Sequence, residues 1–249
     1  MASARVSYGE TRMTNILAVH TLASTSRRTQ FTVGVAAALA TGAMFRYPGG
    51  TALDATTSGY SLSRNFLSDL GMTVAYDGQP NRLGAALFVL SLIVLVVGLG
   101  YGVLRIARTL SVHPAARPWA RAAMICGLLA GAAFTGVAFT PENSAMDLHV
   151  AFTFWGWRIM PLVAACLALA SYKSPAPRPR VAVTWLIVAV LLAGYAALLD
   201  WGPSVRTADG LVVQVVAQKA AAVTVIVALL IVAHEIESTR ASVQRVRAT

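Results

Sequence analysis

Two cationic side chains lie inside long apolar stretches, where a charge is costly unless it has a partner. Arg158 lies in one stretch, and Lys219 lies in another with Gln218 beside it. Ionisable groups at such depth usually face a bundle interior or a wet cavity. We expect these cations to pair with acids or carbonyls and fix helix packing, or to line one pocket for an anionic group. Snorkelling toward the membrane interface is a third alternative.

Several acidic side chains and a histidine lie near the ends of the apolar stretches. Asp69, Glu142 and His149 are predicted to lie at one mouth of a helical bundle, where carboxylates and a histidine can do acid–base chemistry or hold a metal. Their spacing is not diagnostic, and we expect no metal and no cofactor. Asp147 suits the N-cap of the helix that follows, which leaves His149 as the titratable candidate. A hydrogen bond from His149 to a loop explains it equally well.

The sequence lacks the motifs of several enzyme classes, which makes those classes unfavourable assignments. The chain has no HExxH, GxSxG or Walker sequence, and His234-Glu235 has no second histidine one turn away. This argues against a zincin, a serine-hydrolase elbow and a ceramidase-like metal site. Cys126 and Cys166 both fall in apolar runs, where free cysteine packs as a small hydrophobic residue.

The elements that must position these residues are membrane helices. The 249 residues are 57% hydrophobic and only 12% charged, whereas a soluble domain carries about 25% charge. A spanning helix needs about 20 mostly apolar residues. The predicted fold is therefore all-α, a polytopic membrane helical bundle of six transmembrane helices. The predicted spans are about residues 29–45, 83–104, 119–140, 148–172, 181–199 and 211–233 of a membrane domain over 29–235, between tails at 1–28 and 236–249.

The distribution of basic residues predicts the orientation. With the N-terminus inside, fourteen Lys and Arg residues fall on inner segments and four on outer ones, namely Arg46, Arg64, Arg82 and Arg206. Cytoplasmic segments carry the excess of Lys and Arg. We therefore predict a multi-pass protein of the cell membrane with both termini cytoplasmic. We attribute the net charge of +10 to basic residues that determine the membrane topology, and we expect no nucleic-acid partner.

Small residues in the third predicted span allow two kinds of helix contact. Gly127 and Gly131 form a GxxxG spacing, which lets helices approach closely. Packing within the chain is the favoured interpretation, and a homo-oligomer is the alternative.

The long segment between the first two spans is predicted to fold back over the bundle mouth. A loop of this length is usually functional or disordered. Ser68-Asp69-Leu70-Gly71 lies among apolar residues that give the loop surface to bury, which a disordered loop would lack.

Three short motifs together resemble the bacterial and archaeal membrane family known as domain of unknown function 998. They are Ser68-Asp69-Leu70-Gly71 with Asn81 before the second span, Pro141-Glu142 followed by His149, and a polar-basic pair in the last span. Here that pair is Gln218-Lys219, whereas the family often has Gln or Glu followed by Arg. The resemblance covers roughly residues 30–235. It implies a six-span fold and supplies no agreed activity.

Together these residues predict an outward-facing polar pocket that binds or modifies a lipid-like or isoprenoid substrate with an anionic group. Asp69, Glu142 and His149 are the candidate catalytic residues. The candidate ligand-binding residues are Arg158, Lys219, Gln218, Asp147 and Ser68. Membrane lipids are the expected partners. The sequence leaves open whether the protein is an enzyme, and a small-solute or ion transporter and a non-catalytic scaffold or regulator remain alternatives.

Overall fold

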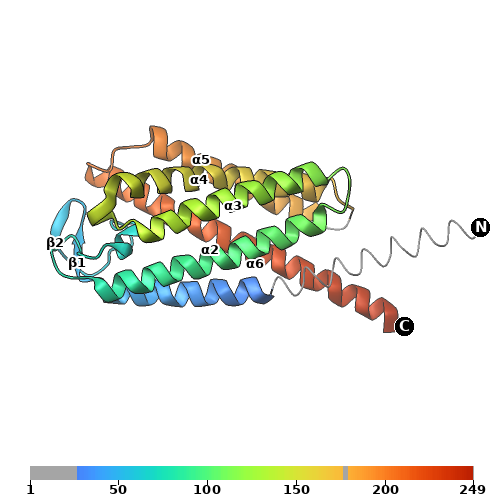
Figure 1. Cartoon of the computed structure of the whole chain (residues 1–249), viewed down its shortest axis with the longest axis horizontal. Coiled ribbons are helices and arrows are strands. Elements are labelled where there is room, and N and C mark those ends of the chain that lie inside the picture. Colours follow the sequence, from blue (N-terminus) through green and yellow to red (C-terminus); the bar gives the residue numbers. More distant parts are fainter. Residues whose placement is uncertain (1–26, 176–178, 249) are drawn as a thin grey trace, which may run out of the picture.

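The computed structural model describes residues 27–175 and 179–248, and within them the chain forms six α-helices that run up and down in sequence (Figure 1). The first covers residues 27–46. The others are α2 (Arg82–Leu110), α3 (Arg117–Phe139), α4 (Glu142–Tyr172), α5 (Pro179–Trp201) and α6 (Ala208–Ala248). The helices extend beyond most of the predicted spans, and α6 continues as a helix over the described residues, 236–248, of the predicted C-terminal tail. The predicted N-terminal tail lies outside the described residues, apart from residues 27 and 28, which belong to the first helix.

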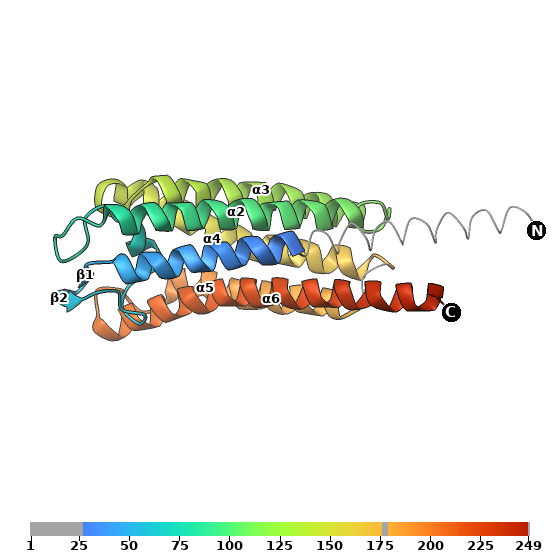
Figure 2. The same ribbon diagram turned by 90° about the horizontal axis from the view of Figure 1, so that it is seen from below.

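The two ends of the bundle differ. One end, here called the hairpin end, carries a small antiparallel hairpin of β1 (Gly49–Thr51) and β2 (Asp54–Ser58), and the 3-10 helix η1 (Ser68–Gly71). The α3–α4 and α5–α6 connections lie at this same end (Figures 1 and 2). The opposite end holds the α2–α3 and α4–α5 connections. The hairpin is absent from the all-helical prediction, because its strands are too short to show an alternating pattern.

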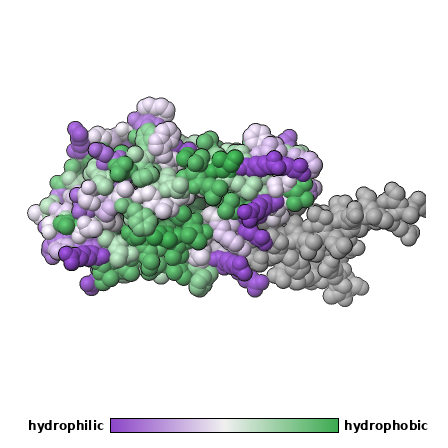
Figure 3. All heavy atoms as spheres, viewed as in Figure 1, coloured by the Kyte–Doolittle hydropathy of each residue, from purple (hydrophilic) through white to green (hydrophobic). Residues whose placement is uncertain are grey.

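Five helices are long and apolar enough to cross a membrane: α2, α3, α4, α5 and the part of α6 over Ala208–Leu229. The helix over residues 27–46 is not among them. Large apolar side chains are exposed along the middle of these helices, and Figure 3 shows them as a hydrophobic region between two more polar ends. Apolar surface on this scale is unusual for a soluble monomer. The helices thus fit an integral membrane protein.

Glycines of α3 are contact points between helices within the chain. A Cβ added to Gly127 would meet Val103 of α2 at 3.0 Å, and one added to Gly136 would meet the Phe152 ring of α4 at 2.5 Å. The GxxxG face therefore packs against α2, as the favoured interpretation predicted.

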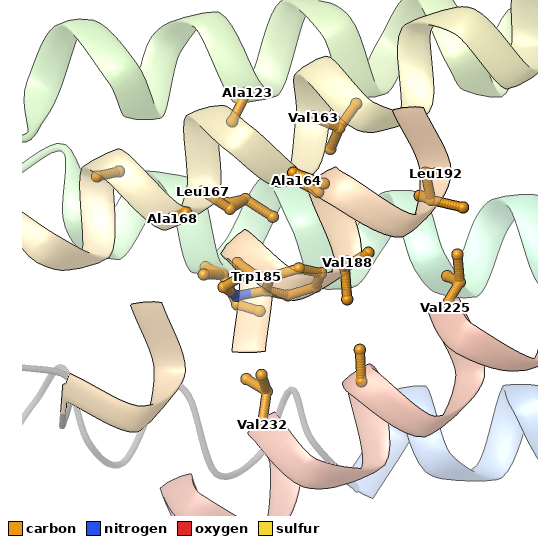
Figure 4. Close-up of a cluster of buried hydrophobic side chains, with 14 of the residues drawn as sticks. Ala123, Val163, Ala164, Leu167, Ala168, Trp185, Val188, Leu192, Val225 and Val232 are labelled. Carbon is orange, nitrogen blue, oxygen red and sulfur yellow. The ribbon is translucent and has the colours of Figure 1, made fainter. Parts of the chain in front are cut away.

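The main core lies between α4, α5 and α6 and extends to α2 and α3. Leu167 of α4, Trp185 and Leu192 of α5, and Val225 of α6 are buried there (Figure 4). Burial of such side chains contributes about 1.5–3 kcal/mol each relative to water; in a membrane the same contacts act through close packing instead. This core fixes the distance between α4 and α6, the two helices that contribute charged residues to the site below.

Candidate functional site

Residues 60–72, here called the strap, fold back onto the hairpin end of the bundle. Asn65, Asp69 and Leu70 are almost completely buried, with 0%, 1% and 0% of their surface exposed. Leu70 packs in a small apolar cluster with Tyr47 and Phe88, next to the end of the first helix and the start of α2. The prediction that Ser68-Asp69-Leu70-Gly71 covers the bundle mouth is confirmed by this burial.

Asn81 fastens the strap to the first turn of α2. Its Nδ2 donates hydrogen bonds to the carbonyl oxygens of Leu70 (3.1 Å) and Met72 (2.9 Å). The amide needs the space beside Gly84, since a Cβ there would lie 2.1 Å from Asn81 Oδ1. The asparagine that opens the predicted second span thus occupies the N-cap position of α2, and its side chain holds the strap rather than capping the helix.

Two neighbouring side chains of α6 fasten the other side of the strap. Gln218 Oε1 accepts a hydrogen bond from the backbone N–H of Leu67 at 2.8 Å. Lys219 Nζ donates to the carbonyl oxygen of Asn65 and lies 5.3 Å from the centre of the Tyr60 ring. The predicted polar pair of the last span therefore contacts the strap directly, across about 150 residues of sequence.

Asp69 is the buried carboxyl of this site. Its Oδ2 accepts hydrogen bonds from Asn65 Nδ2 (2.9 Å) and from the backbone N–H of Phe66 (3.0 Å). Burial and, next, the negative charge of Glu142 raise the pKa of Asp69 to about 8, against the lowering effects of hydrogen bonds from Asn65 and Phe66 and of the Lys219 ammonium. A carboxyl in this environment holds its proton near neutral pH.

Glu142, the first residue of α4, completes the cluster. Tyr76 donates its hydroxyl to Glu142 Oε1 at 3.0 Å. The next residue, Asn143, exchanges two hydrogen bonds with Thr73, at 2.9 Å from the Thr73 N–H and 3.0 Å to its hydroxyl. The start of α4 is thereby held beside the end of the strap, which places the charge of Glu142 near Asp69. The site thus holds one fully buried carboxyl, Asp69, and one partly buried carboxyl, Glu142.

His149 and Asp147, both expected at the bundle mouth, have different surroundings in α4. His149 is buried, and its Nδ1 lies 2.6 Å from the Thr140 carbonyl oxygen, so Nδ1 carries the proton. This is the loop hydrogen bond predicted as an alternative to catalysis. Asp147 is exposed, and its carboxylate accepts no backbone hydrogen bond within the described residues; α4 begins earlier, at Glu142, with Pro141 at its N-cap position. The predicted N-cap role of Asp147 is wrong.

The two membrane cations have separate partners. Arg158 forms an ion pair with Asp200 of α5, donates to the Phe154 carbonyl at 3.1 Å and lies over the Phe154 ring. Lys219 contacts the strap instead. The described contacts thus bring Lys219, Gln218, Asp69 and Ser68 together at the strap, and they give Arg158 the structural role of linking α4 to α5.

Asn65, Tyr60 and Tyr76 belong to the site although sequence reasoning did not single them out. Asn65 precedes Asp69 by four residues and donates to it, whereas both tyrosines reach the site from parts of the loop with no recognisable motif. Among the described residues no group of three His, Cys, Asp or Glu side chains could hold a metal ion. The side chains gathered at the site carry carboxyl, amide, ammonium and phenol groups.

A scan against protein-family models finds no match for this chain, and searches of curated proteins and of solved structures find none either. The resemblance to domain of unknown function 998 stays a prediction.

Proposed function

We propose that the chain is a six-span integral membrane protein of the cell membrane with its hairpin end outside and both termini in the cytoplasm. The helix over residues 27–46 would be the sixth span. It packs along α2, where the Ser91 hydroxyl donates to the Ala36 carbonyl at 2.7 Å. The orientation is supported by the basic residues that flank the opposite end, Arg105, Arg108, Arg117, Arg121, Lys173 and Arg180, because cytoplasmic segments carry the excess of Lys and Arg.

We propose further that the site under the strap binds, and acts by acid–base chemistry on, the anionic head group of a lipid-like or isoprenoid substrate. The observation that supports this most is the buried carboxyl of Asp69, which accepts hydrogen bonds from Asn65 and Phe66 of the strap and interacts electrostatically with Glu142 of α4 and Lys219 of α6. Asp69 and Glu142 differ in environment as an acid–base pair requires. Lys219 supplies the positive charge beside them, and the exposed apolar flanks of the helices suit an acyl or prenyl chain.

Lipid retention tests this proposal. The protein would be purified in a mild detergent, and bound lipids identified by native mass spectrometry. We expect an anionic lipid on the wild-type protein and its loss from Lys219→Met, because the ammonium beside Asp69 is removed. Arg206→Met, which removes an exposed cation from the same end, is the matched control and should retain the lipid. A wild-type protein that carries no anionic lipid, or equal retention by both variants, would contradict the proposal and favour a transporter or a scaffold.

A further inference from the structure

The two carboxyl oxygens of Asp69 have different surroundings. Oδ2 accepts two N–H hydrogen bonds, from Asn65 and Phe66. These donors occupy the lone pairs of Oδ2, so a proton bound by this carboxyl must lie on Oδ1. Oδ1 is buried and has no hydrogen-bond partner within the part of the chain that the structure describes. The strap thus fixes one oxygen and leaves the other, although buried, without a hydrogen-bond partner among the described residues.

The charged and titratable groups around Asp69 come from several elements. The charges of Glu142 in α4 and Lys219 in α6 act on the Asp69 carboxyl. The hydroxyl groups of three tyrosines interact electrostatically with it: Tyr60 of the strap, Tyr47 and Tyr76. Two of the three phenols already donate elsewhere: Tyr60 to the carbonyls of Asn65 and Phe66, and Tyr76 to Glu142.

We propose that Asp69 is held as a neutral carboxylic acid whose Oδ1 hydroxyl donates a hydrogen bond to a phosphoryl oxygen of the bound head group. This rests on the proposed function, and it names the head group as a phosphate and the role of Asp69 as a donor. A buried hydroxyl without an acceptor is costly, so the site favours a ligand that supplies an acceptor oxygen. The pKa of about 8 agrees with this protonation state at neutral pH.

Lys219 provides the second contact that a phosphoryl group needs. Its ammonium has three N–H donors, of which the Asn65 carbonyl takes one. A phosphate presents several acceptor oxygens, so one oxygen can accept from Asp69 Oδ1 while another accepts from Lys219. An ionised Asp69 would instead repel the phosphate, as Glu142 does. The neutral acid therefore explains how two carboxyl groups and an anionic head group can share one site.

Asparagine at position 69 distinguishes a neutral donor from a carboxylate. Its amide oxygen can replace Oδ2 and accept from Asn65 and Phe66, and its Nδ2 then replaces the Oδ1 hydroxyl as donor. Asp69→Asn should therefore bind a phosphoryl group as the protonated wild-type protein does, but without dependence on the protonation of residue 69.

The experiment measures binding of phosphatidic acid to the full chain in nanodiscs of neutral lipid between pH 6.5 and pH 9. We expect equal affinity of wild type and Asp69→Asn at pH 6.5, and wild-type binding roughly tenfold weaker than that of the variant at pH 9, one pH unit above the pKa. The variant also corrects for the titration of phosphatidic acid. Inorganic phosphate should compete if the free group suffices, and diacylglycerol should bind far more weakly.

Each other outcome overturns a different part of the account. If wild type binds phosphatidic acid and Asp69→Asn does not, Asp69 is not a neutral donor, although the proposed function stands. If diacylglycerol binds as well as phosphatidic acid, the acceptor is not a phosphoryl oxygen. If wild type binds neither lipid, the proposed function fails, and this inference fails with it. An infrared titration of the Asp69 carboxyl, identified by its absence in Asp69→Asn, tests protonation without a ligand; ionisation below pH 7 would overturn the inference.

Discussion

The proton on Asp69 links the stability of the fold to pH. Burial and the nearby charge of Glu142 raise the pKa of Asp69 from 3.8 to about 8 in the folded state. Between these two values the folded protein binds one proton more than the unfolded chain. The stability contributed by this proton is therefore fully present below about pH 4 and is lost as the pH rises through about 8, at up to about 1.4 kcal/mol per pH unit.

We predict that Asp69→Asn removes this pH dependence. The free energy of unfolding of the wild-type protein in mixed micelles should fall between pH 5 and pH 8, and that of the variant should fall less steeply because asparagine does not titrate. Asp54→Asn is the control, since hydrogen bonds from Thr56 lower the pKa of that surface carboxyl and give it the opposite linkage. Parallel slopes for wild type and Asp69→Asn would show that Asp69 does not hold a proton in the folded state.

Site residues could be predicted from the sequence where a polar or charged side chain lies in an apolar stretch. They could not be predicted where only the folding of a loop brings side chains together. Gln218 and Lys219 are conspicuous in the sequence because polar side chains are rare inside spans. Tyr76 and Asn65 are ordinary loop residues, and only the folded strap places them beside Glu142 and Asp69. Arg158 was conspicuous for the same reason as Lys219, but its partner, Asp200, is 42 residues away and could not be identified from spacing.

At the scale of elements, the fit between the strap and α2 depends on the missing side chain of Gly84. We predict that Gly84→Ala destabilises the protein by about 1–3 kcal/mol, because the new Cβ would overlap Asn81 Oδ1 and displace the amide that holds Leu70 and Met72. Thermal unfolding in detergent, monitored by circular dichroism, measures the loss.

Gly100→Ala in the same helix is the matched control. No heavy atom lies within 4 Å of a Cβ built there, so the substitution should be neutral or stabilise the protein by about 0.5–1 kcal/mol through the better helix propensity of alanine. Equal effects of the two substitutions would show that the space beside Asn81 is not what matters at position 84.

The helices themselves could be predicted because a run of about 20 mostly apolar residues is typical of a membrane-spanning helix. The strap was predictable as a covering element from the apolar residues around Asp69. The hydrogen bonds that hold the strap to α2 could not be predicted. They need the Asn81 amide to fit beside Gly84, and only the folded turn between the strap and α2 brings these two residues together. The start of α4 was predicted at Leu148 and lies at Glu142, since the first turn is polar and stands outside the apolar stretch.

At the scale of the whole molecule, the up-and-down order of the helices puts the strap, the hairpin and the start of α4 at one end. The opposite end is rich in arginine. Cytoplasmic segments carry the excess of Lys and Arg. If the arginine-rich end is therefore cytoplasmic, the polar site at the hairpin end lies on the other side of the membrane. The orientation determines which compartment supplies the substrate and the proton of the proposed reaction.

Single-cysteine labelling with a membrane-impermeant reagent tests this most directly. Cys126 and Cys166 would be replaced by alanine, and one cysteine introduced at either Ala55 in β2 or Ala115 in the α2–α3 connection, both of which are exposed, whereas Asp69 is buried and unsuitable. We predict that intact cells label Ala55→Cys, and label Ala115→Cys only after the membrane is broken. Labelling of Ala115→Cys from outside intact cells, with Ala55→Cys protected, would place the Asp69 site in the cytoplasm and contradict the account.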